Sequence, residues 1–189
     1  MLSPLWCTRE ECRYEEGKVA TVWLDGCSGC HMSLLDMDAA VISLGRKIDL
    51  VYGPLVDAQE FPEDVDVTLV EGAVSSQEDL NKVQKIRQRT NILISMGDCA
   101  VTGNVRAMRN SIPVQKLLQR IYVDGADEKR VVPSERVPAL LKQARPSREF
   151  VKVDICLPGC PPPSKTIVGV INDLLDGKKP NGNLKVKFG

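Results

Sequence analysis

Short apolar runs rich in β-branched residues recur along the chain, and most of them are followed by a segment with helical spacing. Runs of this length are typical of strands that are buried on both faces of a sheet. Glycine, proline or acidic residues follow each run, where they favour a turn. Five strands are therefore predicted, over residues 19–24, 48–52, 65–70, 91–96 and 150–157.

The segments between these strands predict helices, and strands that alternate with helices indicate an α/β fold. With right-handed crossovers, the result is a doubly wound, mostly parallel sheet with helices on both faces. Ser75 and Ser76, followed by two acidic residues, are the expected start of one of these helices. Helices are predicted over residues 31–44, from Ser76 to about residue 89, and over 105–110, 114–122 and 166–175, the last capped by Ser164.

The rest of the chain is less regular and sets the expected domain boundaries. Residues 1–17 are polar and read as an N-terminal arm, and residues 18–177 form the single domain. Within it, residues 123–149 are charged, carry three prolines and show weak periodicity outside 137–143, so they predict a long surface excursion that contacts a partner. Residues 178–189 form a basic tail with a possible short strand over 184–188.

The composition fits one soluble domain that has a protein partner. Of 189 residues, 43% are hydrophobic and 26% charged, and Lys plus Arg balance Asp plus Glu at 25 each. A chain without net charge gives no argument for nucleic acid or an anionic membrane as partner. No apolar run approaches the ~20 residues of a membrane span. The first residues carry no export signal, so a cytoplasmic location is expected.

Seven cysteines and a single histidine direct attention to metal or redox chemistry. Disulfides are disfavoured in the cytoplasm, which leaves thiol chemistry and metal binding as the first hypotheses. With His31 as its only histidine, the chain alone cannot form a histidine-rich zinc or di-iron site. Cys27 and Cys30 have C-x-x-C spacing in a strand-to-helix turn, where the helix N-terminus favours thiolate over thiol.

Four of the cysteines follow predicted strands. Cys27 and Cys30 come after the first strand, Cys99 after the fourth and Cys160 after the fifth. The carboxyl ends of parallel strands meet at one edge of the sheet, where ligands bind in such folds. Four thiolates from three loops are the ligand set of a [4Fe–4S] cluster or a Cys₄ zinc site. The nearby glycines, including Gly97, would let the backbone approach a bulky cluster.

Other hypotheses remain open at this point. A C-x-x-C pair that opens a helix is also typical of a thioredoxin-like oxidoreductase, although that leaves Cys99 and Cys160 without a role. A zinc-stabilised interaction module is the other alternative, although structural zinc sites usually take two close pairs of ligands. The cluster hypothesis predicts bound iron, whereas the two alternatives predict zinc or no metal.

The remaining candidate residues have simpler interpretations. Cys156 lies inside an apolar strand and is expected to be a small buried hydrophobe. Cys7 and Cys12 are read as free thiols, with a bridge to a partner's metal site as the alternative. His31 is expected to be an ordinary first-turn helix residue or a donor to a cluster sulfur. Glu71 is expected to handle protons, meet a partner or cap the helix after it.

Four motifs, in matching order, resemble the small subunit of [NiFe] hydrogenases, and in particular the short cytoplasmic type found in the bidirectional, NAD-reducing enzyme. The resemblance covers about residues 18–176. The motifs are V-A-T-V-W-L-D-G-C-S-G-C-H-M-S-L-L-D-M-D from residue 19, V-E-G from residue 70, S-M-G-D-C-A from residue 95 with A-M-R-N from residue 107, and L-P-G-C-P-P from residue 157.

The resemblance implies a flavodoxin-like domain that holds the proximal [4Fe–4S] cluster on Cys27, Cys30, Cys99 and Cys160. It implies a large subunit that holds the Ni–Fe centre, since this chain lacks the second C-x-x-C pair that nickel requires in the family. It also implies diaphorase subunits with iron–sulfur clusters, FMN and NAD. The chain would then relay electrons for H₂ + NAD⁺ = H⁺ + NADH and contribute no catalytic residue itself.

Three features qualify the resemblance. The related 20-kDa-type subunit of respiratory complex I has adjacent cysteines in its first motif, so the spaced pair favours hydrogenase, with complex I kept as an alternative. Family members often have Gly-Gly where this chain has Gly103 and Asn104. Some relatives carry FMN near the cluster, but cysteines occupy the turn that would hold its phosphate, so FMN in this chain is a weak alternative.

Overall fold

The computed structural model describes residues 17–128 and 130–178. The predicted arm up to residue 16, with Cys7 and Cys12, lies outside the described residues, as does the predicted strand over 184–188 in the tail. Within the described part of the chain, no helix is both long and apolar enough to cross a membrane.

A five-stranded parallel sheet forms the centre of the fold. Its strand order is β2-β1-β3-β5-β7, and every neighbouring pair is parallel. Counted along the chain within this sheet, the order is 2-1-3-4-5, which is that of flavodoxin-like folds, so the predicted architecture is confirmed. The strands are β1 (Gly17–Trp23), β2 (Ile48–Tyr52), β3 (Val65–Glu71), β5 (Thr90–Met96) and β7 (Ile155–Leu157).

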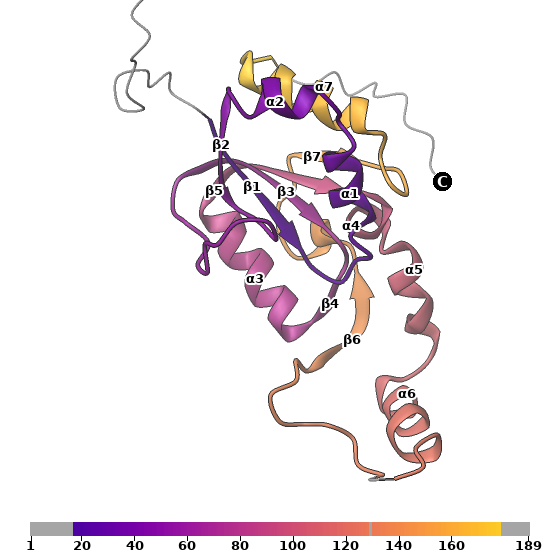
Figure 1. Ribbon diagram of the computed structural model, residues 1–189. Coiled ribbons are helices and arrows are strands. Elements are labelled where there is room, and N and C mark those ends of the chain that lie inside the picture. The colour runs from indigo at the N-terminus through magenta and orange to yellow at the C-terminus, as the bar shows by residue number, and fades with distance from the viewer. Residues whose placement is uncertain (1–16, 129, 179–189) are drawn as a thin grey trace, which may run out of the picture.

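Helices cover both faces of this sheet (Figure 1). On one face lie α1 (Gly29–Leu35), α2 (Ala40–Leu44) and α7 (Ser164–Leu175), and on the other lies α3 (Gln77–Gln88). Side chains alternate between the faces along each strand. Burial of both faces explains why the strands are near-continuous apolar runs in the sequence.

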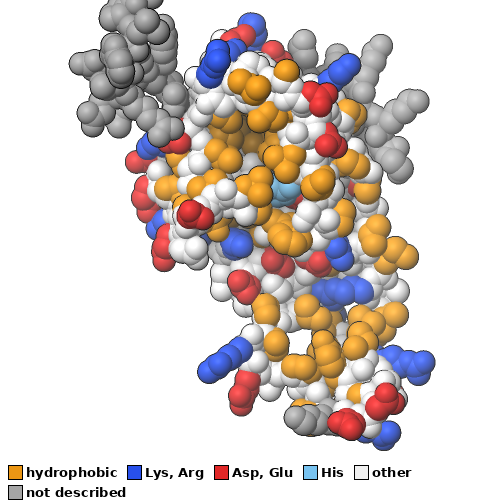
Figure 2. Space-filling view, viewed as in Figure 1, with side chains coloured by type: hydrophobic (Ala, Val, Ile, Leu, Met, Phe, Trp, Pro, Cys, Tyr) orange, Lys and Arg blue, Asp and Glu red, His pale blue; other side chains and the backbone are white. Residues whose placement is uncertain are grey.

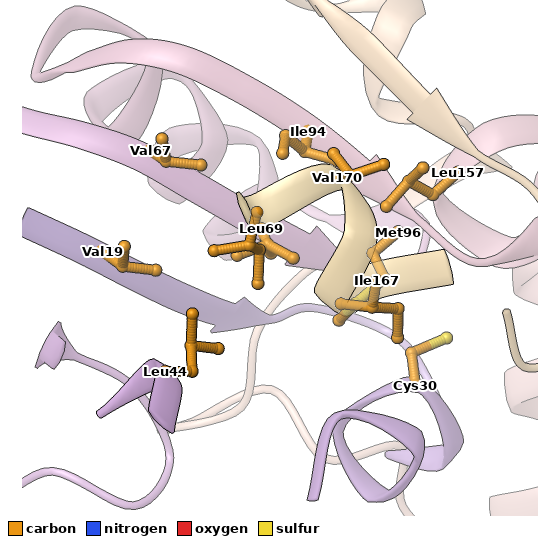
Figure 3. Close-up of a cluster of buried hydrophobic side chains, with 11 residues drawn as sticks. Val19, Cys30, Leu44, Val67, Leu69, Ile94, Met96, Leu157, Ile167 and Val170 are labelled. Carbon is orange, nitrogen blue, oxygen red and sulfur yellow. The ribbon is translucent and has the colours of Figure 1, made fainter. Parts of the chain in front are cut away.

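Two hydrophobic cores result from this alternation, one on each face of the sheet. Val19, Leu69 and Ile94 belong to the core under α7, whereas Ala20 and Leu93 belong to the core under α3. Figure 3 shows the first core, with Cys30 in the first turn of α1 at its edge. Through Cys30, the first core extends to the carboxyl edge of the sheet.

The polar helix α3 begins where the sequence predicts. The Ser76 hydroxyl accepts the backbone N–H of Asp79 at 3.1 Å, and the Asp79 carboxylate accepts the N–H of Ser76 at 2.9 Å. This reciprocal arrangement is a capping box, which satisfies backbone donors that the helix itself leaves free. The predicted hydroxyl cap of the last helix is wrong, because α7 starts at Ser164 itself and Pro163 is its N-cap residue.

The predicted helix over 31–44 is broken into α1 and α2. Residues 36–39 form a turn between them, and Asp38 has a left-handed backbone conformation with φ 50°. Aspartate tolerates this conformation better than most residues and disfavours helix interiors. The apolar periodicity continues across the break because both helices face the same core. The spacing of apolar residues alone therefore does not reveal where the helix breaks.

The predicted fifth strand is shorter than its apolar sequence suggests. Only Ile155–Leu157 pairs with β5, and η3 (Ser147–Glu149) precedes it as a 3-10 turn. The Asp154 carboxylate accepts the N–H of Leu93 at 2.9 Å, which occupies the position of a strand partner. Phe150, Val151 and Val153 still pack against the core below α3, but outside the ladder.

The 123–149 segment is not a purely irregular excursion. It contains β6 (Leu140–Arg145), which pairs antiparallel with β4 (Val74–Ser76) in a small second sheet. Ala144 on β6 and Ser147 after it are buried. Figure 1 shows β6 and the helices before it extending from the main sheet as a lobe. The helical elements of this lobe are α5 (Asn104–Ala107), η1 (Met108–Ser111), α6 (Val114–Gln119) and η2 (Arg120–Asp124).

Candidate functional site

The four cysteines singled out in the sequence all follow strands of the main sheet. Cys27 and Cys30 lie between the end of β1 and the first turn of α1. Cys99 lies in α4 (Asp98–Thr102), directly after β5, and Cys160 lies just after β7. All three strands are parallel, so the structure places the four thiols at the same edge of the sheet.

Backbone contacts tie the loop of Cys99 to the loop of Cys160. The N–H of Gly97 donates to the carbonyl of Leu157 at 2.8 Å, and the N–H of Asp98 donates to the carbonyl of Gly159 at 2.9 Å. In return, the buried Asp98 carboxylate accepts the N–H of Gly159 at 2.7 Å. The two loops therefore form one unit, and their cysteines are held in fixed relative positions.

A further bond joins α1 to the same unit. The Ser33 hydroxyl donates to the carbonyl of Pro162 at 2.6 Å, and both groups are buried. Sequence reasoning did not single out Asp98 or Ser33. Asp98 could have been identified because it directly precedes Cys99. Nothing in the sequence relates Ser33 to Pro162, which is distant along the chain.

Electrostatic coupling shows that the four thiols are close together. Burial is the main cause of a raised pKa at Cys30, and negative charge on Glu71, Cys27, Cys99 and Cys160 raises it further. Without a bound metal, burial and neighbouring negative charge therefore outweigh the helix N-terminus at Cys30 and favour the thiol over the expected thiolate. Thiolates gathered in this way need nearby positive charge to be stable, and a bound metal supplies it.

Cys99 experiences the same surroundings. Burial raises its pKa, the thiols of Cys160 and Cys27 raise it further, and the nearby Arg106 guanidinium opposes them. Each member of the predicted set is thus coupled to others from a different loop. The C-x-x-C pair is not isolated, contrary to what a thioredoxin-like site would require.

The sulfurs do not converge on a single point. Among residues 17–128 and 130–178, no group of three or more His, Cys, Asp or Glu side chains is arranged to hold one metal ion. A mononuclear zinc site needs four ligand atoms around one centre. A polynuclear cluster spreads its ligands over several irons, so it does not require the four sulfurs to meet at one point.

Glycines let the loops approach the thiols. A Cβ atom on Gly97 would lie 2.2 Å from the Cys30 Sγ atom, and Gly97 has φ 86°. Gly159 has φ 134°, and a Cβ there would lie 2.8 Å from the Cα of Pro162. Any other residue would be strained at both positions, and at residue 97 its Cβ would overlap the Cys30 sulfur. Glycine at residue 97 therefore lets the backbone lie directly against this sulfur.

Glu71 and His31 form a buried pair next to Cys30. Glu71 is only 1% exposed, and its carboxylate contacts the His31 Nδ1 atom and accepts the His31 backbone N–H at 3.0 Å. Burial alone would raise the pKa of Glu71, but hydrogen bonds from the His31 ring, the His31 N–H and the Cys30 N–H outweigh it, and the pKa is lowered. Glu71 therefore caps α1, not the helix that follows it in sequence.

The surface around this edge is partly apolar. Cys27 and Cys160 are exposed, and so are Trp23, Met32 and Leu35 next to the C-x-x-C turn. Figure 2 shows apolar side chains gathered around the pale-blue histidine and again on the lobe below it. Exposed apolar patches of this kind mark sites of protein association.

Cys156 differs from its prediction. It is exposed, because β7 is an edge strand of the sheet and one face of it stays open. The Cys156 sulfur is partly buried within the chain, and this partial burial raises the pKa of the thiol. The prediction of a fully buried hydrophobe is therefore wrong, although Cys156 remains outside the group of four thiols.

This chain has Asn104 after Gly103, where family members often have a second glycine, and the backbone explains why asparagine is tolerated. Gly103 ends α4 with φ 90°, and Asn104 follows with φ 37°. Asparagine is among the few residues other than glycine that adopt positive φ readily. The loop after Cys99 thus keeps a path that two glycines would also allow.

Comparisons with known proteins agree with these observations. Residues 27–174 match the family described as NADH ubiquinone oxidoreductase, 20 Kd subunit. The delta subunit of the NAD-reducing hydrogenase HoxS of Cupriavidus necator is 40% identical over 166 residues, covering 85% of this chain and 79% of that relative. A subunit of the F420-non-reducing hydrogenase of Methanocaldococcus jannaschii is 37% identical over 171 residues, covering 89% of this chain and 59% of that relative.

A solved structure extends the similarity to three dimensions. One chain of the crystal structure of NAD⁺-reducing [NiFe]-hydrogenase in the H₂-reduced state superposes with a TM-score of 0.88 at 32% sequence identity. The match covers 93% of this chain and 100% of the other. By contrast, this chain spans only 59% of the length of the Methanocaldococcus relative.

Proposed function

The chain belongs to the family of the 20 kDa subunit of NADH ubiquinone oxidoreductase, where its relatives are hydrogenase subunits, and we propose that it is the electron-transfer small subunit of a [NiFe] hydrogenase. The hydrogenase resemblance in the sequence is confirmed by the relatives and the solved structure. The proposal adds a [4Fe–4S] cluster on Cys27, Cys30, Cys99 and Cys160. It also adds a cytoplasmic location and a partner subunit with the Ni–Fe centre.

One observation carries the proposal: three loops from different strands place four mutually coupled thiols at one edge of the sheet. The lack of a single convergence point among the described residues favours a cluster over one zinc ion. When bound, a cluster of this kind supplies one-electron transfer. The residues of this chain hold its ligands in place and limit the access of water to Cys30.

The proposed partners follow from the surface of the site. Cys27 and Cys160 are exposed, so this chain alone would leave a cluster open to solvent. The exposed apolar side chains of Trp23 at the end of β1 and Met32 in α1 are suited to a large subunit that covers the edge. Electrons would then pass between that subunit and a diaphorase module that uses FMN and NAD⁺.

The experiment that tests the function is metal analysis of the complex isolated from its native host. About four iron atoms and about four acid-labile sulfides per copy of this chain, after subtraction of those assigned to co-purifying chains, are expected for one [4Fe–4S] cluster. Mass spectrometry of the complex should identify a chain with two C-x-x-C pairs. Zinc alone, or no metal with a titratable disulfide, would support one of the rivals instead.

A further inference from the structure

Glu71 is a fully buried carboxylate whose role the electron-transfer function does not by itself explain. It ends β3, and its side chain lies against the turn that carries Cys27 and Cys30. We propose that Glu71 is a positioning residue that holds this turn and whose buried negative charge lowers the reduction potential of the cluster bound there. The inference rests on the proposed function, because it concerns the same cluster.

The contacts of Glu71 explain the positioning role. Its carboxylate binds the His31 backbone N–H and the His31 ring, so it fixes both the start of α1 and the orientation of the imidazole. A Cβ on Gly26 would lie 3.1 Å from the Glu71 Oε1 atom, which shows how closely the turn packs on the carboxylate. The turn can hold its two cysteines in place only while this buried carboxylate has its partners.

The His31 ring is part of the same arrangement. His31 is buried, and its Nε2 atom has no hydrogen-bond partner within the part of the chain that the structure describes. A buried ring nitrogen without a partner is costly unless another group satisfies it. The bond from Nδ1 to Glu71 fixes the direction of Nε2, which leaves that atom available to a group bound at the site or to a partner.

The charge of Glu71 explains the expected effect on potential. Glu71 acts electrostatically on both Cys30 and Cys99, where its negative charge disfavours added negative charge. Reduction adds an electron to a cluster, so a buried anion nearby makes reduction less favourable. In a site with little water this effect is screened only weakly. Charge and hydrogen bonding around a cluster are the levers that set its potential.

Arg106 carries a positive charge near the same site and serves as a comparison for the negative charge of Glu71. Its guanidinium acts on Cys99 in the direction opposite to Glu71, and its Nε atom pairs with the Asp25 carboxylate at 3.1 Å. Although its side chain is 34% exposed, its effect on Cys99 is larger than that of Glu71. Removing this cation should shift the potential in the negative direction, whereas removing the anion should shift it in the positive direction.

The test is a redox titration of the complex, in which electron paramagnetic resonance monitors the reduction of the cluster. Glu71→Gln keeps the size of the side chain and removes the charge, and it should move the midpoint potential to a more positive value. Glu71→Asp keeps the charge and should stay nearer to the unmodified complex. Arg106→Gln should move the midpoint the other way. Asp154→Asn removes a carboxylate at the opposite end of the sheet and should leave the midpoint unchanged.

The outcomes separate this inference from the proposed function. An unmodified complex without iron and sulfide overturns the function itself. A complex with a full cluster, but with the same midpoint in Glu71→Gln as in the unmodified protein, overturns only the inference. If Glu71→Gln lowers the iron content, the positioning role is supported, and the midpoint of Arg106→Gln then decides the role of charge. An unchanged midpoint in Arg106→Gln would in that case contradict the effect of charge on the potential.

Discussion

Gly97 and Cys30 lie so close together that a Cβ atom on residue 97 would stand 2.2 Å from the Cys30 sulfur. The two residues come from different loops, one after β5 and the other after β1. Their contact joins the C-x-x-C turn to the loop of Cys99, and it leaves the sulfur facing backbone instead of a side chain. The arrangement of the candidate site depends on this close approach.

The first prediction follows from this contact. Gly97→Ala should displace the Cys30 thiol and lower the iron content of the complex, because 2.2 Å is well below any real contact distance. Residue 97, with φ 86° and ψ 158°, lies in a region open almost only to glycine, which adds about 1–3 kcal/mol of backbone strain for alanine. Iron analysis and thermal unfolding measure the two effects.

Gly177→Ala is the matched control for Gly97→Ala. Gly177 also has a positive φ, of 69°, but a Cβ there would meet nothing within 4 Å. Its substitution should also strain the backbone, by about 1–2 kcal/mol, without any loss of iron. Equal iron content in the two variants would show that the Gly97 contact does not matter for the site.

The second prediction concerns Asp154 and the pH dependence of stability. Burial would raise the pKa of Asp154, but the Leu93 N–H and Arg87 outweigh it and lower the pKa. A lowered carboxyl pKa stabilises the fold above the unfolded value, near 3.9, and this contribution is lost as pH falls through the folded value. Asp154→Asn should therefore cost about 1 kcal/mol at pH 7, a modest effect because solvent screens a partly exposed pair.

Urea unfolding at several pH values checks this prediction. The difference in free energy of unfolding between Asp154→Asn and the unmodified chain should be largest near pH 7 and should shrink below about pH 4. A difference that stays constant over this range would mean that the ionised carboxylate is not the source of the stability. Lys152, which lies 3.6 Å from Asp154 on the surface, should matter less than Arg87.

Much of the fold could be predicted from the sequence, because strands buried on both faces leave plain apolar runs. The ends of β2 were predicted to the residue, and those of β1, β3 and β5 to within one or two. The predictions failed where a tertiary contact decides the local structure. Asp154 replaces a strand partner, which shortens β7, and β6 depends on its pairing with β4, which is distant along the chain.

The site was predicted in outline but not in its internal bonds. Cysteine positions after strands were enough to bring the four thiols to one edge. The contacts of Glu71 with His31, and of Asp98 with Gly159, join residues from different loops and leave no local pattern. The prediction for Cys156 failed because an apolar neighbourhood in the sequence does not tell an edge strand from a central one.

The third prediction concerns the lobe as a partner surface. Val131 is 70% exposed and Val137 is 47% exposed, both within the 123–149 segment. Deleting the whole segment would also remove β6 and the buried Ala144, so point substitutions are the better test. The double variant Val131→Ser with Val137→Ser should weaken assembly about tenfold or more, since covering the exposed part of a Val side chain contributes on the order of 1 kcal/mol.

Native mass spectrometry of the complex over a dilution series measures this weakening. Ile42→Ser is the control, because Ile42 is 65% exposed on α2, outside the lobe. Iron content per copy of the chain should stay the same in the lobe variant, since the four thiols lie elsewhere. If the lobe variant stays assembled on dilution as well as the unmodified complex does, the prediction that a partner binds the lobe is contradicted.

The central claim is that Cys27, Cys30, Cys99 and Cys160 together hold one [4Fe–4S] cluster, and iron content of single serine variants tests it most directly. The decisive comparison is Cys99→Ser, in α4 directly after β5, against Cys156→Ser, in the neighbouring strand β7. Cys99→Ser should lose or alter the cluster, with less iron and sulfide or a changed paramagnetic spectrum, while Cys156→Ser keeps about four iron atoms. Full iron and an unchanged spectrum in Cys99→Ser would contradict the claim.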